Sequence, residues 1–530
     1  MKSRGARSGV GLFLFGVMLP LMVQAQVAVT TYHNDNYRSG VNSHETILTP
    51  SNVNEVRFGK RHTLPVVGYV YAQPLYVPRV NINGMLHNVV YVVTEHDQAY
   101  AFDADSGALL WHKDFLIPTN ASKRIMPMSS DDVDCSATGS EVGITSTPVI
   151  DLSTNQIYIV AATKEVVNNQ ASFYYRMHVL DIATGVEKLL GPAFGAPIKA
   201  KVPGTGGGSQ DGYITFDPRM HIQRAALTLA NGLVYVSWGS FCDVGTWHGW
   251  VMAFNKSSLW PSGVLMPTPD GYDGGIWNSG GGIAVDANNK LYLSTGNGLF
   301  DANLGGNDYA DSVLRLSWTG NQPVIEDYFT PWDYGWLDSY DWDLSSGGML
   351  LLPDQPGAHY PHLLIQAGKE GTIDLINRDN LGHYNASGDT QIVQTLPMYL
   401  TMYWGSPVMW NNNLYIGGQF ARLQAFRYDP VQQQIQVPST SATRVLFGYP
   451  GPTPSVSSNG TANGIVWVFD SYSIVRAYDA TNLGHELYNS NQNSGRDQAG
   501  VVLQFVTPTV ADGHVIIGAQ NEVDIYGLLN

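Results

Sequence analysis

The chain has 530 residues, of which 14% are charged, 44% hydrophobic and 11% aromatic, with 56 glycines and 28 prolines. This composition excludes a disordered chain, a coiled coil and a collagen-like repeat. The formal net charge of −16 argues against a nucleic acid or an anionic membrane as partner, and two cysteines are too few for a disulfide-rich scaffold.

Residues 1–25 are predicted to be a signal peptide. Three basic residues precede an apolar run at 10–23, and the segment ends in a small residue, Ala25. The apolar run is too short for a spanning helix, and no later stretch approaches the roughly 20 apolar residues that one needs. We therefore expect an exported protein, periplasmic or secreted, without membrane insertion. An uncleaved N-terminal anchor is the alternative.

Residues 26–530 carry a repeated β-meander. The clearest copy starts at Val89 and has two alternating apolar strands around a polar turn, then an Asp/Gly turn and a third strand at Leu110-Trp111. Seven further copies consist of Ile157–Val160 with Met177–Gly185, Leu233–Trp238 with Val251–Asn255, Leu291–Thr295 with Val313–Ser317, His362–Gly368 with Thr372–Arg378, Leu414–Gly418 with Leu423–Tyr428, Ile465–Phe469 with Ile474–Asp479, and His514–Gly518 with Glu522–Leu528.

Eight such units cannot each bury an apolar face alone, which favours radial stacking into an all-β, eight-bladed β-propeller of four-stranded meanders. The last unit reaches the C-terminus without a fourth strand, and we expect residues 56–66 to supply it and close the ring. No linker divides the chain, so residues 26–530 are predicted to form a single propeller domain. A ring of seven blades with one decayed copy is the alternative.

The segment Ala101–Gly107 with the following Trp111 resembles the tryptophan-docking repeat of the pyrroloquinoline quinone (PQQ) dehydrogenase propellers, and Arg38 with Leu48–Val53 resembles their N-terminal signature. The resemblance implies a PQQ- and calcium-dependent dehydrogenase that oxidises an alcohol or a sugar. The same fold occurs in chains that bind no quinone. The alternative is therefore a non-catalytic propeller that binds a glycan or a protein partner on its loop face.

The resemblance also implies roles for four residues. Trp277 matches the tryptophan that stacks beneath PQQ, and Lys369 matches the cation that contacts the quinone oxygens. Glu165 and Asn297 match the two calcium ligands. Each has a structural alternative: a tryptophan that fills the central tunnel, a loop lysine paired with Glu370, a solvated Lys-Glu turn and a turn asparagine.

The catalytic base departs from the family pattern. The family carries Gly-Asp-Asn shortly after the ligand asparagine, whereas Gly306 stands at the aspartate position here. Asp308 is the candidate base, and Asp301 and Asp311 are close enough in sequence to replace it. The loop 338–343 resembles a family loop rich in aspartate and tryptophan, and it could hold Ca²⁺ or brace itself by hydrogen bonds.

The cysteines also differ from the family pattern. The family often has two adjacent cysteines that form a ring disulfide over the quinone, whereas Cys135 lies alone. In an oxidising compartment we predict a disulfide between Cys135 and Cys242, on neighbouring loops. Glu141 stands where the family often has an arginine that binds the quinone carboxylates, and an acid there would repel them.

Overall fold

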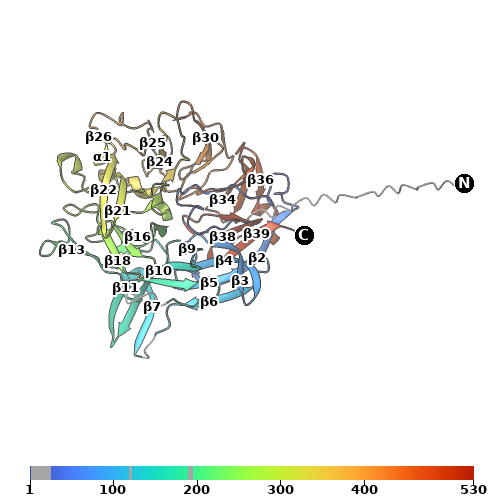
Figure 1. Cartoon of the computed structure of the whole chain (residues 1–530), viewed down its shortest axis with the longest axis horizontal. Coiled ribbons are helices and arrows are strands. Elements are labelled where there is room, and N and C mark those ends of the chain that lie inside the picture. The colour runs from blue at the N-terminus through green and yellow to red at the C-terminus, as the bar shows by residue number, and fades with distance from the viewer. Residues whose placement is uncertain (2–25, 119–121, 189–194, 530) are drawn as a thin grey trace.

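The computed structural model describes residue 1 and the ranges 26–118, 122–188 and 195–529. The predicted signal peptide at 1–25 lies outside the described residues, except for Met1. In the described ranges, eight sheets of four or five strands are arranged in a ring (Figure 1). The prediction of an all-β, eight-bladed propeller is confirmed, and the alternative of seven blades is wrong.

The blades follow one another along the chain. Blade 1 consists of β3 (Leu75–Ile82), β4 (Met85–Thr94), β5 (Gln98–Asp103) and β6 (Leu109–Asp114). Blade 2 consists of β9 (Val149–Asp151), β10 (Gln156–Val167) and β11 (Gln170–Asp181), with β7 (Lys123–Ser129) and β8 (Glu141–Val142). Blade 3 consists of β14 (His221–Ile222), β15 (Thr228–Ala230), β16 (Leu233–Ser240), β17 (Trp250–Asn255) and β18 (Pro261–Leu265). Blade 4 consists of β19 (Ala284–Val285), β20 (Leu291–Ser294), β21 (Val313–Thr319), β22 (Gln322–Thr330) and β26 (His383–Tyr384).

The second half of the ring repeats the plan. Blade 5 consists of β23 (Leu350–Leu351), β24 (Leu363–Ala367), β25 (Ile373–Asn377) and β27 (Gln394–Leu396). Blade 6 consists of β28 (Val408–Trp410), β29 (Asn413–Ile416), β30 (Gln424–Asp429), β31 (Gln434–Ile435) and β32 (Ser441–Ala442). Blade 7 consists of β33 (Ser455–Asn459), β34 (Ala462–Phe469), β35 (Val475–Asp479) and β36 (Glu486–Asn489), with β1 (Val41–Asn42). Blade 8 consists of β37 (Thr509–Ala511), β38 (His514–Gly518), β39 (Gln520–Leu528) and β2 (Phe58–Tyr69). Outside the blades lie the hairpin of β12 (Lys201–Pro203) and β13 (Tyr213–Thr215) and the helices α1 (Tyr334–Tyr340) and α2 (Ser494–Asp497).

Stacking of the blades explains why the inner strands are apolar on both faces. Every residue of β16 is buried, because blades 2 and 4 cover its two sides. Trp111 shows how neighbouring blades dock. Its indole Nε1 donates to the carbonyl oxygen of Ile182 in the next blade at 2.9 Å. A Cβ on Gly185, which has φ +67°, would lie 2.7 Å from the Trp111 ring, so only glycine leaves room for this tryptophan.

An N-terminal strand closes the ring, as the sequence predicts. Strand β2 pairs antiparallel with β39, from Phe58 opposite Leu528 to Tyr69 opposite Gln520. In Figure 1 the blue β2 lies beside the red C-terminal strands. A strand from the first part of the chain and the C-terminal strands therefore share one sheet, which removes an open sheet edge.

The segment 29–45 crosses the ring and ties several blades together. Its backbone contacts reach blades 1, 2, 4 and 5 through Val29 with Tyr76, Thr30 with Ile150, Asn36 with Val285, and Tyr37 with Leu351. Arg38 is buried, and its guanidinium donates to Thr228 Oγ1 at 2.6 Å and to the Ile283 carbonyl at 2.9 Å. We call residues 29–45 the N-terminal plug.

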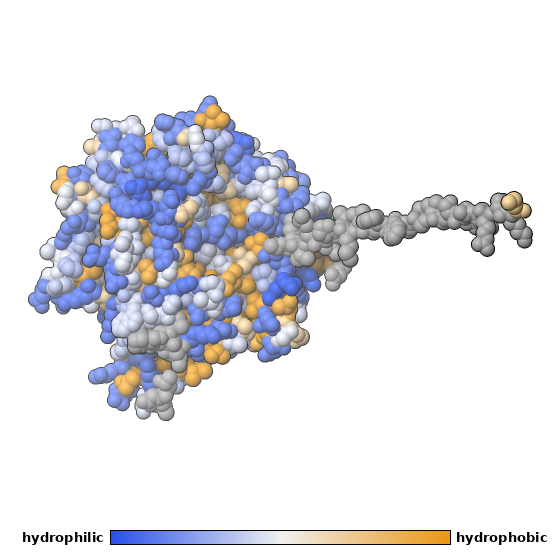
Figure 2. Space-filling model, in the orientation of Figure 1, coloured by the Kyte–Doolittle hydropathy of each residue, from blue (hydrophilic) through white to orange (hydrophobic). Residues whose placement is uncertain are grey.

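The outer surface is mixed in character. Figure 2 shows hydrophilic residues over much of the visible face, with hydrophobic residues interspersed among them. In the part of the chain that the structure describes, no helix combines the length and hydropathy needed to cross a membrane.

Candidate active site

A cavity of about 360 Å³ lies where the loops of several blades meet. Trp277 and Lys369, two residues predicted for the cofactor site, both line it. They come from the connection that leads into blade 4 and from the β24–β25 turn of blade 5. Loops of blades 2, 3, 6 and 7 complete the walls, with Cys135, Cys242 and Trp404 among the lining residues. Converging loops of this kind are where propellers and other rigid scaffolds commonly place function.

Trp277 offers a flat surface to the cavity. Its ring is wedged against Gly239 at the end of β16, where a Cβ would lie 2.7 Å from the ring. Trp247 meets it edge-on, with 5.9 Å between ring centroids. The indole Nε1 is buried and has no hydrogen-bond partner. The close backbone contact fixes the ring, and its exposed part can stack on a planar ligand.

Lys369 and two aspartates form an ionic cluster at the cavity wall. The ammonium group lies 2.6 Å from Asp343 Oδ2 and 2.8 Å from Asp341 Oδ1. Burial alone would lower the pKa of Lys369, but the attraction of Asp343 and Asp341 outweighs it and raises this pKa. The backbone N–H of Lys369 also donates to the Asp343 carbonyl at 3.1 Å. Asp343 is therefore held by both the side chain and the backbone of Lys369.

Asn297 lies against the same two aspartates. Its backbone N–H donates to Asp343 Oδ1 at 3.0 Å, and its Nδ2 donates to Asp341 Oδ1 at 3.1 Å. Its Oδ1 is buried without a partner. Gly296 makes the approach possible, since a Cβ there would lie 2.2 Å from Asp343 Oδ1. An unpartnered amide oxygen beside carboxylates is suited to a hard cation.

More acids surround this cluster than Lys369 can neutralise. Asp311 is buried, its Oδ2 has no partner, and burial together with the charge of Asp343 raises its pKa strongly. Burial and the charge of Asp243 raise the pKa of Asp273 to about 7. The local charge favours entry of a cation. Even so, no group of three histidine, cysteine or acidic side chains among the described residues is already arranged to hold a metal ion.

Arg224, which the sequence did not single out, supplies a second cation. It lines the cavity between β14 and β15, and its guanidinium carbon lies 3.8 Å from the centre of the Phe505 ring. Burial lowers the pKa of the Arg224 guanidinium. No sequence motif marks this arginine. Glu141, at the position of the family arginine, instead accepts a hydrogen bond from His96 Nδ1 at 2.9 Å and is not a lining residue.

The predicted disulfide is present. Cys135 and Cys242 are bonded, with 5.6 Å between their Cα atoms, and both line the cavity. Cys135 lies in the β7–β8 connection of blade 2, and Cys242 follows β16 of blade 3. The bridge thus joins two loops of neighbouring blades at the cavity wall.

Two predicted site residues lie elsewhere. Asp308, the candidate base, is fully buried and is not a lining residue; its Oδ1 accepts from the backbone N–H groups of Asp270 and Gly271, both at 3.0 Å. Glu165, the candidate calcium ligand, lies on β10 with its carboxylate 2.6 Å from both Lys123 and Arg176. The carboxylate that the fold brings beside Lys369 and Asn297 is Asp343. In the sequence, the only indication of Asp343 is its place in loop 338–343, which is rich in aspartate and contains the neighbouring Trp342.

No family model matches this sequence, and no curated protein matches it. Solved structures match in fold. A quinohemoprotein alcohol dehydrogenase from Comamonas testosteroni aligns with a TM-score of 0.60 and 14% identity, over 96% of this chain and 81% of that one. A quinohemoprotein alcohol dehydrogenase from Pseudomonas putida HK5 aligns with a TM-score of 0.60 and 14% identity, over 95% and 80%. A europium-containing methanol dehydrogenase aligns with a TM-score of 0.58 and 11% identity, over 94% and 98%.

The chain has the propeller fold of the quinoprotein dehydrogenases. The resemblance predicted from the sequence is thereby confirmed for the fold. Sequence identities this low carry no residue roles, so function has to be argued from the cavity itself.

Proposed function

We propose that the protein is a quinoprotein dehydrogenase that uses PQQ and a divalent cation, Ca²⁺, to oxidise an alcohol or a sugar. The observation that carries the proposal is the cavity in which Trp277 and Lys369 meet, with Arg224 as a second cation. A planar quinone that bears carboxylates needs a flat stacking surface and positive charge around it. The cavity supplies both, and its volume of about 360 Å³ is within the range of small-molecule sites.

The donor set also suits the cation. Asn297 Oδ1 is unpartnered, the carboxylate of Asp341 lies against the Asn297 side chain, and that of Asp343 accepts from the Asn297 backbone N–H. Amide and carboxylate oxygens are the ligands that Ca²⁺ prefers. We assign Asn297 and Asp341 as the cation-binding residues, and Glu165 has no part in this assignment because Lys123 and Arg176 already neutralise it.

Asp343 is the residue that we assign as the base. When bound, PQQ supplies the two-electron oxidant that takes the hydride from the carbinol carbon. Asp343 lines the cavity and would accept the proton of the substrate hydroxyl on a carboxylate oxygen. Lys369, 2.6 Å from that carboxylate, orients it, and Trp277 orients the ring on which the substrate reacts.

The test is a titration of the purified protein with PQQ, with and without Ca²⁺, followed by absorbance and thermal shift. We expect saturable binding that needs Ca²⁺, and oxidation of an alcohol or sugar by the loaded protein with an artificial electron acceptor. Trp277→Ala should weaken binding by about 5- to 150-fold, since loss of an aromatic stacking partner costs on the order of 1–3 kcal/mol. The control is Trp260→Ala, a tryptophan that is 55% exposed and does not line the cavity.

Absence of PQQ binding under any Ca²⁺ concentration would overturn the proposal. It would favour the alternative function, a non-catalytic propeller that binds a glycan or protein partner on its loop face. The proposal includes export to the periplasm or the cell exterior, which the disulfide between Cys135 and Cys242 supports because disulfides persist in oxidising compartments.

A further inference from the structure

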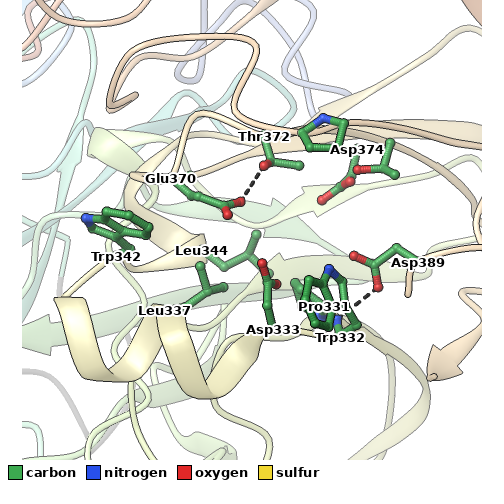
Figure 3. Close-up of a pocket in the computed structure, with 13 residues that line it drawn as sticks. Pro331, Trp332, Asp333, Leu337, Trp342, Leu344, Glu370, Thr372, Asp374 and Asp389 are labelled. Atoms are coloured by element: carbon green, nitrogen blue, oxygen red, sulfur yellow. Dashed lines mark hydrogen bonds between the residues drawn. The ribbon is translucent and has the colours of Figure 1, made fainter. Parts of the chain in front are cut away.

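A second cluster of acids lies outside the proposed cofactor site. A pocket of about 70 Å³ is formed where the β22–α1 loop of blade 4 faces β25 and β27 of blade 5. Figure 3 shows four carboxylates facing one another around it: Asp333, Glu370, Asp374 and Asp389. None of them lines the PQQ cavity.

No positive charge compensates these four acids. No lysine, arginine or histidine lines the pocket, and within the described ranges none of the four carboxylates forms an ion pair. Their hydrogen bonds go to neutral groups or to one another: the Trp332 backbone N–H donates to Asp389 at 2.9 Å, the Thr372 hydroxyl donates to Glu370, and Glu370 also bonds to Asp333. Four acids in one small pocket without a cation cost free energy unless protons or a metal ion neutralise them.

The buried carboxylate of Asp374, which has an unpartnered oxygen, indicates that the pocket holds a ligand. It stands in the middle of β25 and is only 2% exposed, a position that an apolar residue would normally fill. Its Oδ1 has no hydrogen-bond partner, and the side chain lines the pocket. Burial and the neighbouring acids raise its pKa strongly, and burial together with Asp333 raises the pKa of Glu370 to about 7. A buried carboxylate with a free oxygen lacks its partner in the protein itself.

We propose that this pocket is a structural Ca²⁺ site, with Glu370, Asp374 and Asp389 as ligands and Asp333 completing the shell. The larger, geometrically tolerant Ca²⁺ suits carboxylates from separate loops better than Mg²⁺, which requires a near-ideal octahedron. Among the described residues no three acidic side chains are already arranged around a metal position, so the proposal requires the Glu370 carboxylate to turn from Thr372 towards the ion.

The acidic pocket and the neighbouring cavity share one loop. Trp342 and Leu344 line the acidic pocket, while Asp341 and Asp343 from the same loop line the PQQ cavity. Glu370 likewise follows Lys369 directly. A cation in the pocket therefore clamps the two loops that position Asp343 and Lys369.

The test measures Ca²⁺ binding calorimetrically in the full chain without PQQ, in an Asn297→Ala/Asp341→Asn background that removes the two residues assigned to the cation of the dehydrogenase site. We expect one saturable equivalent of Ca²⁺ and an increase in Tm with Ca²⁺ concentration, as linkage requires. Asp374→Asn should lower the affinity at least about tenfold, the cost typical of losing even an outer-shell partner. Asp389→Asn serves as a second variant if Asp374→Asn does not fold. Asp379→Asn is the matched control, since Asp379 is exposed, follows β25 and pairs with His362.

Two results would overturn the proposal. One is Ca²⁺ binding that is unchanged by both Asp374→Asn and Asp389→Asn. The other is the absence of Ca²⁺ binding, and a rise in Tm on Asp374→Asn substitution, equal with and without the ion, would then identify the cluster as a set of protonated acids. Because PQQ is absent from this experiment, either result leaves the proposed dehydrogenase function to its own titration.

Discussion

At the scale of single residues, Asp343 and Asp308 differ in their position relative to Lys369, and this difference decides which of them we assign as the proposed base. Asp343 is tied to Lys369 at 2.6 Å and to the Asn297 backbone at 3.0 Å, and it lines the cavity. Asp308 lies much closer to Asn297 along the sequence than Asp343 does, but its carboxylate accepts hydrogen bonds from two backbone N–H groups instead. Proximity along the chain is therefore a weaker guide than the contact between blades 4 and 5.

Replacing these two aspartates separates the two candidates for the base. Asp343→Asn should lower kcat of the PQQ-loaded protein by about 10²–10⁴-fold, the usual contribution of a general base. Asp308→Asn should leave kcat within a few-fold of the wild type and lower Tm instead, because the amide replaces one acceptor oxygen of a buried turn. Steady-state kinetics and thermal shift on both variants check this. The reverse ranking of the two kcat values would return the role of base to Asp308.

At the scale of structural elements, the disulfide links two loops that the sheets leave unpaired. Cys135 and Cys242 are separated by 107 residues, and both carrying loops line the cavity. A cross-link over that chain length stabilises the native state chiefly by restricting the unfolded chain. The same bond orders the cavity wall, so stability and cofactor binding should respond to it together.

The double variant Cys135→Ser/Cys242→Ser tests this. The free energy of unfolding should fall by roughly 2–5 kcal/mol, the range typical for loss of a native disulfide. PQQ affinity should fall as well, because the loop that carries Cys242 and Asp243 then has to be ordered on binding. Chemical denaturation and a PQQ titration measure the two effects. Single variants are unsuitable controls because each leaves a free thiol, so the reduced wild-type protein is used. Unchanged stability would show that the loops are ordered without the bond.

The sequence predicts the elements that depend on local patterns, but not the contacts between blades. The meander repeats and the closing strand were predictable because alternation of apolar residues is a local property, and β2 lies within two or three residues of the predicted 56–66. Trp277 and Lys369 were found in the cavity because each stands in a recognisable local motif. The contact of Asp343 with Lys369 joins blades 4 and 5, and the pairing of Glu165 with Lys123 depends on the inserted strand β7. No local pattern encodes such long-range contacts.

At the scale of the whole molecule, the N-terminal plug holds the ring together from inside and makes its stability depend on pH. His33 of the plug is completely buried, stacks on Tyr32 with 4.7 Å between ring centroids, and has an Nε2 without a partner. Burial lowers the pKa of His33 from 6.5 to about 3. The native protein therefore keeps this ring neutral over a pH range in which the unfolded chain binds a proton.

Burial of His33 makes the free energy of unfolding fall as the pH falls. Because the pKa of His33 is depressed in the native state, its stabilising contribution is complete above pH 6.5 and is lost as the pH falls from 6.5 towards 3. At pH 5 the loss amounts to about 2 kcal/mol, at 1.36 kcal/mol for each pH unit below 6.5.

His33→Asn removes the titration and suits the backbone, since φ at this position is +53° and asparagine tolerates that region. Denaturant unfolding at pH 7 and pH 5 should show a smaller drop in the free energy of unfolding for His33→Asn than for the wild type. His44→Asn, an exposed residue of the same segment, should retain the wild-type drop. Equal drops in all three proteins would mean that His33 gains solvent access before the ring unfolds, and that the plug leaves the propeller in a separate step.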